Sequence, residues 1–358
     1  MKAVVVKEVG VLEIQDVPEP DCKPDEIKVK IAYAGICGTD SIILKGQIAG
    51  PPPEGVVSRP QKPGIVPDDV KMMGHEMREG LRIIGHEASG TIVQIGKDIK
   101  GDFKIGQHVA MNYKSVCGAC HYCTDMMANF CERTAPFSGA MAEYSVYREN
   151  TVFALPDDLP LDVGAFLEPL SIAVHALDIA RMKLGDSVLI TGGGPIGLLL
   201  LQLALKSGAS KVLVSEPVAE KRALAKQFGA HIVDPLKEDL LAVANKLTDG
   251  RGFNVCFEAS GIPAIARQLL LLTDGDGTIV WVASYPRNFD LGVPINYFSS
   301  KELTLRGVRQ TPYSYPRALQ MLPTLDLKPL IKVYPLQEAI AAFEAHKKGQ
   351  GIKIMLKP

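Results

Sequence analysis

The sequence predicts an α/β chain that combines a doubly wound parallel sheet with a mostly β, partly open barrel domain. Short β-like runs separated by Pro and Gly fill the first 150 residues, where helical periodicity is almost absent. From about Asp186, strands alternate with helices, as in "SVLITGGG", "PIGLLLLQLALKSGA" and "KVLVSE". Such alternation favours a parallel sheet. With 358 residues, the chain is long enough for two domains of ordinary size.

The order of these two sequence patterns along the chain predicts how the two domains are assembled. The β-rich texture covers residues 1–156 and the alternating texture covers 157–293, whereas strand-like pieces such as "ELTLRGV" and "IKIMLKP" return within 294–358. We therefore expect one β-rich domain built from both ends of the chain, with the doubly wound domain inserted between them. A Pro- and Gly-punctuated stretch at 49–81 has few strand signals and predicts a long loop.

Composition and charge exclude several classes of function. Apolar residues make up 47% and charged residues 22%, which is typical of a globular protein rather than a disordered one. A net charge of −1 gives no electrostatic reason to expect nucleic acid or an anionic membrane as a partner. No apolar run is long enough to cross a bilayer, and the first residues do not resemble a signal peptide. We expect a cytoplasmic protein.

A glycine pattern at the start of the alternating region predicts a dinucleotide site. Gly192, Gly194 and Gly197 spell G-x-G-x-x-G directly after a strand, with Pro195 and Ile196 opening the following helix. The first glycine permits a tight turn, the second lets the backbone approach a pyrophosphate, and the third packs helix against strand. The pattern therefore predicts a Rossmann nucleotide-binding domain.

An acidic residue at the end of the next strand extends this site and bears on cofactor choice. Glu216 lies nineteen residues after Gly197, where an acid hydrogen-bonds the adenosine ribose hydroxyls. Because a carboxylate there repels a 2′-phosphate, the sequence favours NAD over NADP. Lys221 and Arg222 follow closely and leave NADP open, and Lys221 is included among the cofactor-binding candidates.

Four of the seven cysteines predict a metal site. Cys117, Cys120, Cys123 and Cys131 give the spacing C-x2-C-x2-C-x7-C within a lobe at about 112–133. Four thiolates around a tetrahedral Zn²⁺ leave no open coordination position, so such a site is structural. The same spacing can hold an iron–sulfur cluster. The β-rich surroundings, which lack a second cluster motif, favour zinc.

Cys37, far from that lobe, is a candidate ligand of a second metal ion. It lies in "AGICGTD". Glu168 lies in the apolar run "GAFLEPLSIAV", where an unpaired carboxylate would be costly to bury and therefore needs a cation or a proton. A cysteine, a histidine and a glutamate from separate segments suit a zinc ion that keeps one exchangeable position.

Taken together, these stretches resemble the zinc-dependent medium-chain dehydrogenases over nearly the whole chain. The resemblance is carried by "AGICGTD", "IIGHEASGTIVQIG", "CGACHYCTDMMANFC", "FLEPLSIAVHA", "ITGGGPIG" and "KKGQGIKIMLKP". Within this family the motifs resemble the sorbitol dehydrogenase branch most, followed by the threonine and butanediol dehydrogenases. The resemblance implies a dehydrogenase that oxidises a secondary alcohol or polyol with NAD, with two Zn²⁺ ions per chain.

The resemblance also distinguishes two Gly-His-Glu motifs that lie eleven residues apart. In the family, the zinc-binding histidine of G-H-E is followed by small residues and a strand, as in "GHEASGTIVQIG". The other copy, "GHEMREG", continues into charged residues within the 49–81 loop. His86 and Glu87 are therefore expected to be the working pair, and His75 and Glu76 a coincidence.

By this resemblance, the catalytic zinc is held by Cys37, His86 and Glu168, with Glu87 as a displaceable fourth ligand. Asp40 would orient His86. The zinc lowers the pKa of the alcohol oxygen, and hydride then passes from the carbinol carbon to the nicotinamide ring. The family mechanism further implies that Thr39 accepts and passes on the alcohol proton.

Two departures from the family leave the substrate open. Ile42 stands where many relatives carry a proton-relay histidine. Gln310 and Thr311 occupy the places of an Arg-Tyr pair that reads polyol hydroxyls in sorbitol dehydrogenases, with Arg309 one residue earlier. A threonine- or butanediol-type enzyme acting on a smaller vicinal substrate is therefore the alternative.

A non-catalytic nucleotide-binding relative is disfavoured, because such a protein is expected to lack zinc ligands that are all present here. The expected partner is a small-molecule alcohol, and we expect the chain to form a homotetramer or homodimer. The long loop at 49–81 is expected to wall the substrate cleft or to contact a neighbouring subunit, with Met72, Met73 or His75 near the distal end of the substrate.

Overall fold

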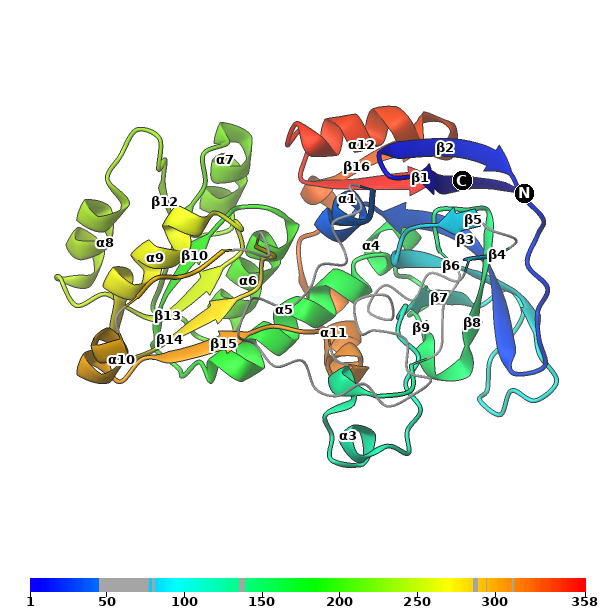
Figure 1. Cartoon of the computed structure of the whole chain (residues 1–358), viewed down its shortest axis with the longest axis horizontal. Helices are drawn as coiled ribbons and strands as arrows, with labels where there is room; N and C mark the ends of the chain where they lie inside the picture. Colours follow the sequence, from blue (N-terminus) through cyan, green and yellow to red (C-terminus); the bar gives the residue numbers. More distant parts are fainter. Residues whose placement is uncertain (45–76, 79–80, 135–138, 286–288, 294, 311) are drawn as a thin grey trace. The chain divides into compact units, whose positions relative to one another are not determined.

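The structure, a computed structural model, describes residues 1–44, 77–78, 81–134, 139–285, 289–293, 295–310 and 312–358. Two compact units make up the chain: Met1–Glu168 together with Thr311–Pro358, and Pro169–Gln310 (Figure 1). None of the helices in these described stretches has the length and hydropathy needed to span a membrane.

The first unit is rich in β structure and contains two sheets. One sheet has the strand order β16-β17-β3-β6-β7-β9, with β8 also paired to β3, and the other has the order β2-β1-β5-β4. The strands are β1 (Lys2–Glu8), β2 (Val11–Asp16), β3 (Glu26–Gly35), β4 (Met77–Arg78), β5 (Leu81–Ile83), β6 (Glu87–Ile95), β7 (His108–Met111), β8 (Tyr144–Arg148), β9 (Val152–Ala154), β16 (Ile331–Pro335) and β17 (Lys353–Lys357).

Short helices complete this unit. Its α-helices are α1 (Gly38–Leu44), α3 (His121–Thr124), α4 (Leu161–Gly164), α11 (Tyr315–Met321) and α12 (Ala339–Lys347). Its 3-10 turns are η1 (Ala128–Phe130), η2 (Glu149–Thr151), η3 (Pro312–Ser314), η4 (Leu322–Thr324), η5 (Lys328–Leu330) and η6 (Leu336–Glu338). The longer helix α5 (Leu167–Ala180) starts at the end of the unit's first segment.

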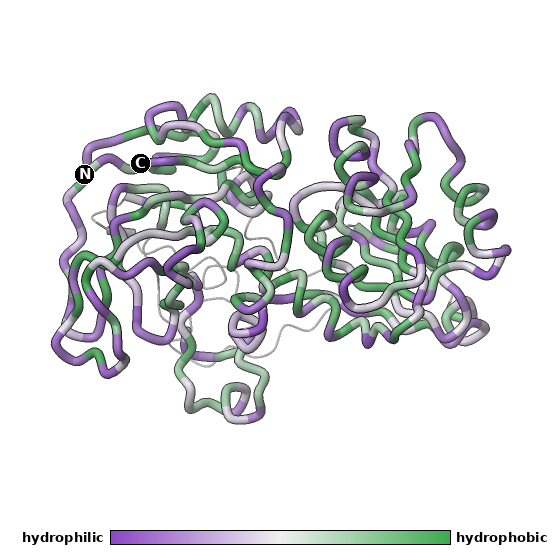
Figure 2. Tube along the Cα trace, turned by 180° about the vertical axis from the view of Figure 1, so that it is seen from behind, coloured by the Kyte–Doolittle hydropathy of each residue, from purple (hydrophilic) through white to green (hydrophobic). Residues whose placement is uncertain are grey.

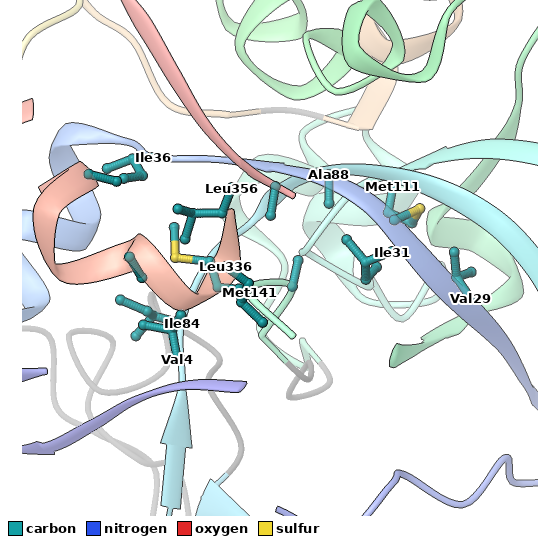
Figure 3. Close-up of a cluster of buried hydrophobic side chains, with 14 of the residues drawn as sticks. Val4, Val29, Ile31, Ile36, Ile84, Ala88, Met111, Met141, Leu336 and Leu356 are labelled. Carbon is teal, nitrogen blue, oxygen red and sulfur yellow. The ribbon is translucent and has the colours of Figure 1, made fainter. Parts of the chain in front are cut away.

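The central strand β3 organises the core of this unit. Its apolar side chains, such as Val29 and Ile31, are buried with Ala88 and Met111 and with Leu356 (Figure 3). β3 pairs antiparallel with β6, and the register sets Gly35 opposite Glu87. Because β3 ends shortly before Cys37 and β6 begins directly after His86, this pairing brings the two sequence motifs together.

The second unit is a six-stranded parallel sheet in the order β12-β11-β10-β13-β14-β15. The strands are β10 (Ser187–Thr191), β11 (Lys211–Ser215), β12 (His231–Val233), β13 (Phe253–Glu258), β14 (Thr273–Trp281) and β15 (Thr304–Gly307). The connecting helices are α6 (Pro195–Lys206), α7 (Ala219–Gln227), α8 (Leu240–Thr248), α9 (Pro263–Leu272) and α10 (Ile295–Lys301). This arrangement of the sheet confirms the predicted doubly wound α/β class.

Local sequence explains where several of these helices begin. Asp239 caps α8 by accepting a hydrogen bond from the Leu241 amide, and Pro263 takes the first position of α9. The apolar faces pack on strands that are buried along most of their length. Figure 2 shows the hydrophobic residues following the inner strands and the hydrophilic residues gathering at outer turns.

The boundaries between the units lie later in the chain than the sequence textures suggest. The sequence predicts changes after residues 156 and 293, whereas the compact units change after Glu168 and Gln310. In particular, "ELTLRGV" forms β15, which pairs parallel with β14 as the edge strand of the parallel sheet. A short strand with exposed positions looks the same in either sheet, and only its pairing partner assigns it to a unit.

Candidate active site and metal centres

Cys37, His86 and Glu87 converge in the β-rich unit. Their potential ligand atoms all lie within 4.8 Å of one another. Cys37 follows the end of β3, and His86 and Glu87 lie at the start of β6, so the β3–β6 register brings them together. A thiol, an imidazole and a carboxylate offer the ligand types that a catalytic zinc site uses.

Asp40 holds this group in place from α1. Its side chain is fully buried; one oxygen accepts a hydrogen bond from the Cys37 amide at 2.9 Å, and the other lies 3.5 Å from His86 Nδ1. A carboxylate on one ring nitrogen fixes the orientation of the histidine and leaves the second nitrogen free to bind a metal. The role expected for Asp40 therefore has a geometric basis.

The electrostatics of this site are dominated by burial and close pairing. Burial by itself would raise the pKa of Cys37, but His86 lowers it to about 7. Burial would lower the pKa of His86, yet Asp40 and Cys37 together raise it well above its ordinary value. Several acidic groups thus meet in a region with little solvent, which is an environment that stabilises a bound cation.

Lys353 supplies a buried positive charge beside these groups. Its ammonium pairs with the Glu87 carboxylate and donates to the Ile36 carbonyl at 3.2 Å, and burial lowers its pKa to about 8. Lys353 is not among the site residues predicted from the sequence. The signal was a lysine within "GIKIML", an otherwise apolar strand in which a lysine has to be paired.

Glu168 lies close to this group but is not part of it. The residue is buried in the first turn of α5, and it falls outside the set whose ligand atoms lie within 4.8 Å. Burial raises its pKa to about 8, an effect that His86 opposes and that Cys37 and Asp40 reinforce. Glu168 is thus coupled electrostatically to His86, Cys37 and Asp40, whereas Glu87 is the carboxylate within the 4.8 Å group.

Two more side chains border the site. Thr39 is half-buried in the first turn of α1, two residues after Cys37. The ring of Tyr113 meets His86 edge to face, with centroids 5.2 Å apart and planes at 62°. Tyr113 is not among the residues predicted from the sequence, because an aromatic residue just after a strand has many possible roles.

Cys117, Cys120, Cys123 and Cys131 form a compact group in the lobe that contains α3 and η1. Four of the sulfur–sulfur distances are 3.5, 3.6, 3.9 and 3.9 Å. Tetrahedral zinc with Zn–S bonds of about 2.3 Å needs sulfurs about 3.8 Å apart. The group therefore fits a four-thiolate zinc ion.

Backbone amides also favour the thiolate form of Cys117. The amides of Cys120 and Cys117 donate to Cys117 Sγ and Cys131 Sγ, at 3.3 and 3.4 Å. Hydrogen bonds lower the pKa of Cys117 to about 6, and the bond from the Ala119 backbone has the largest effect. Tyr313 joins the lobe to η3 by donating to the Cys123 carbonyl at 3.0 Å. These amide contacts suit a resident metal ion.

The glycine-rich turn has the geometry that a pyrophosphate needs. Gly192 adopts φ +96°, a conformation that favours glycine, and an added Cβ on Gly197 would collide with the Gly192 carbonyl. Gly194 is the N-cap of α6, with open space around its Cα, and Pro195 and Ile196 form the half-exposed first turn. The amides of this first turn can therefore reach an anion.

Glu216 is turned toward that same turn. Its carboxylate is buried and accepts hydrogen bonds from the Gly193 amide at 2.7 Å and the Val218 amide at 2.8 Å. Behind it, Arg222 donates to the Glu216 carbonyl at 2.8 Å and pairs with Asp234 at 2.8 Å. Arg222 is thus already engaged by two acceptors.

Lys221 is half-buried in the first turns of α7. At the other end of the unit, Gln310 is buried and Arg309 is half-buried. The expectations for Met72, Met73, His75 and Glu76, for Thr311, and for nearly all of the 49–81 loop fall outside the described residues.

Comparison with known proteins decides the family. A zinc-binding dehydrogenase domain model matches residues 195–324, and an alcohol dehydrogenase GroES-like domain model matches residues 23–157. D-arabitol-phosphate dehydrogenase of Enterococcus avium is 32% identical over 95% of this chain and 92% of its own length. The chain belongs to the zinc-dependent medium-chain dehydrogenases.

Further similarities agree with this membership. Sorbitol dehydrogenase of Bacillus subtilis is 28% identical over 100% of this medium-chain dehydrogenase and 97% of its own length. A zinc-binding dehydrogenase from Sinorhizobium meliloti, solved with NADP, has a TM-score of 0.85 and 28% identity over 100% of this chain and 99% of its own. This medium-chain dehydrogenase is therefore an oxidoreductase that uses zinc and a nicotinamide cofactor, as the sequence predicted.

Proposed function

We propose that this dehydrogenase oxidises a secondary alcohol of a polyol-like substrate to the ketone with NAD. The β-rich unit would be the catalytic domain, and the parallel-sheet unit would hold the cofactor. The observation that carries the proposal is the convergence of Cys37, His86 and Glu87 within 4.8 Å. These three residues would hold a zinc ion and would leave it able to bind a substrate oxygen.

The residues around this group have separable tasks in the proposed reaction. When bound, zinc supplies a Lewis acid for the alcohol oxygen, and NAD supplies the acceptor of hydride. Asp40 fixes the His86 ring and the Cys37 backbone through its two carboxylate oxygens. Thr39, half-buried beside Cys37, offers a hydroxyl that can accept and pass on the alcohol proton.

Two carboxylates remain candidates for the third ligand of the catalytic zinc. Glu87 belongs to the converging group, but it shares its charge with Lys353. Glu168 is buried near the group and lies outside the 4.8 Å set. We infer that a bound zinc would take Glu87 or Glu168 as its third protein ligand, and that Lys353 would pair with Glu87 when Glu168 is the ligand.

A second, structural zinc is proposed for the four-cysteine lobe. Support comes from sulfur separations of 3.5 to 3.9 Å and from backbone amides directed at Cys117 and Cys131. This gives two zinc ions per chain. Because four thiolates close the coordination shell, this ion would stabilise the lobe and take no part in the reaction.

The preference for NAD is proposed from Glu216. Its buried carboxylate lies beside the glycine turn, where it can accept hydrogen bonds from the ribose hydroxyls. The negative charge of this carboxylate would repel the 2′-phosphate of NADP. Arg222, the nearby cation that could offset this repulsion, is engaged by Asp234 and the Glu216 carbonyl.

A polyol-like substrate is supported by the relatives. One is a D-arabitol-phosphate dehydrogenase and another is a sorbitol dehydrogenase. Both phosphorylated and free sugar alcohols are therefore candidate substrates for an activity assay. Reduction of NAD should be measured with sugar alcohols, their phosphates, diols and hydroxy amino acids. The proposal expects the highest kcat/KM within the sugar-alcohol classes. A clear preference for threonine or butanediol would overturn it.

A further inference from the structure

The chain crosses between its two compact units at two places, and these crossings differ in structure. The first lies between Glu168 and Pro169, inside the continuous helix α5. The second lies between Gln310 and Thr311, after the edge strand β15 and before the 3-10 turn η3. A helix holds its own backbone through internal hydrogen bonds, whereas an irregular segment depends on the groups that attach it to its surroundings.

The second crossing is short. At its start, the Val308 amide donates to the Trp281 carbonyl of the parallel sheet at 3.0 Å. Five residues later, the Tyr313 hydroxyl donates to the Cys123 carbonyl of the four-cysteine lobe at 3.0 Å. Five residues span at most about 18 Å when fully extended. A bond that fixes Tyr313 therefore restricts the whole crossing.

Two ties of different kinds hold the chain where it enters the β-rich unit again. Tyr315 is fully buried, and its ring stacks on Phe153 of β9 with centroids 4.9 Å apart. Tyr313 is more exposed and is attached to the lobe, where η3 also contacts η1. The tie at Tyr315 belongs to the buried core, whereas the tie at Tyr313 depends on the shape of the lobe.

The cysteines largely determine the shape of the lobe. Its small core consists of Cys120, Cys123 and Ala128, with Val116, Cys117, Tyr122 and Cys131 packed against it. The helix α3, which carries Cys123, has only four residues and is too short to be stable by itself. A zinc ion held by the four thiolates would supply the missing stability. Cys123 would then bind zinc through its sulfur while its carbonyl accepts the Tyr313 hydroxyl.

The base of the lobe is fixed to the β-rich unit by other contacts. The Ser115 hydroxyl donates to Asn150 Oδ1 at 3.0 Å, and Asn150 Nδ2 donates to the Val116 carbonyl at 3.0 Å. Asn150 lies in η2, between β8 and β9. A lobe that is anchored at its base and held rigid by a metal ion can therefore hold Tyr313 to the β-rich unit.

We propose that Tyr313 is a positioning residue, which makes the second crossing depend on zinc in the four-cysteine lobe. The inference rests on the structural zinc and on the roles of the two units proposed above. That zinc takes no chemical part, but hydride transfer requires substrate and cofactor to meet within about 3.5 Å. A crossing that is held less firmly lowers the fraction of molecules with this geometry. Loss of the lobe zinc should thus slow turnover without removing any group from the catalytic site.

Tyr313→Phe tests the tie directly, because it removes the hydroxyl and keeps the ring. Hydrogen exchange should be followed by mass spectrometry on the enzyme with its zinc bound. We expect the amides of residues 308–314 to exchange about three- to tenfold faster, as for the loss of one hydrogen bond, while those of α11 stay unchanged. Unchanged exchange at 308–314 would overturn the proposal.

Thr124→Ala is the matched control for that experiment. The Thr124 hydroxyl donates to the carbonyls of Cys120 and His121, so its bonds stay within the lobe. Thr124→Ala should leave exchange at 308–314 as in the wild type. An increase equal to that of Tyr313→Phe would mean that any weakening of the lobe loosens the crossing, and would remove the specific role of Tyr313.

Kinetics separate positioning from stability. With the sugar alcohol or sugar-alcohol phosphate that reduces NAD fastest, kcat/KM should fall about threefold in Tyr313→Phe, while the zinc content stays the same and the melting temperature changes little. An unchanged kcat/KM would mean that the bond only stabilises η3, and would overturn the proposal.

Cys120→Ser, which removes the lobe zinc, should lower kcat/KM and speed exchange at 308–314. Adding Tyr313→Phe to it should change neither quantity further, because the two changes break the same tie. Additive effects would overturn the role of Tyr313 alone, whereas one zinc ion per chain in the wild type would overturn the proposed structural zinc. If Cys120→Ser does not fold, exchange in Tyr313→Phe still decides whether the tie holds the crossing.

Discussion

Lys353 and Glu87 form an ion pair inside the β-rich unit, with side chains only 2% and 4% exposed. Lys353 comes from β17, near the end of the chain, and Glu87 from the start of β6. Gly35 on β3 lies against both, and a Cβ there would collide with them. A cation at this point provides Glu87 with a partner that does not depend on a metal.

Replacing Lys353 with Met should destabilise the zinc-depleted protein by about 3–5 kcal/mol, because Glu87 is left as an uncompensated buried charge. The loss should be smaller in the zinc-loaded protein, where the metal supplies the missing positive charge. Urea unfolding with and without a chelator measures both values. Glu87→Gln/Lys353→Met is the control and should recover most of the lost stability. The same loss with and without zinc would show that Glu87 does not reach the metal.

Metal analysis should find about two zinc ions per chain, since two separate groups have suitable ligands. Cys37→Ala should lose one equivalent and all turnover while keeping the melting temperature within a few degrees. Cys120→Ser should lose the other equivalent and increase proteolysis within the lobe at about 112–133. Iron in place of zinc, or loss of both ions in Cys37→Ala, would contradict the two-site assignment.

The duplicated Gly-His-Glu motif provides a comparison with its own control. His86→Ala should empty the catalytic site and abolish turnover, because His86 belongs to the group around Asp40. His75→Ala should leave the zinc content unchanged. Zinc content and NAD reduction should be measured on both variants. Loss of a zinc equivalent in His75→Ala would show that His75, and not His86 alone, binds zinc.

Glu216→Ser should lower kcat/KM with NAD and raise the relative use of NADP by about tenfold, because a repulsion and a ribose hydrogen bond are both lost. Adding Asp234→Asn should raise the use of NADP further, since the ion pair that holds Arg222 is removed. Steady-state kinetics with both cofactors measure the ratio. An unchanged ratio in the single variant would remove Glu216 from the cofactor site.

The sequence alone determined the features that depend on local chemistry. A few neighbouring residues were enough to predict the glycine turn, the acid after the next strand and the four-cysteine metal site. Turn geometry and ligand spacing are local constraints. The alternation of strands and helices predicted the parallel sheet for the same reason. The distinction between the two Gly-His-Glu copies came from the resemblance to a family, and His75 lies outside the described residues.

Only the tertiary structure decided the features that depend on pairing between distant segments. Strand "ELTLRGV" joined the parallel sheet because its partner is β14, which its own residues do not indicate. Lys353 met Glu87 because β17 pairs with β3 and β3 pairs with β6. Side chains that share a site across strands are chosen by register, and register is a property of the folded sheet rather than of any one segment.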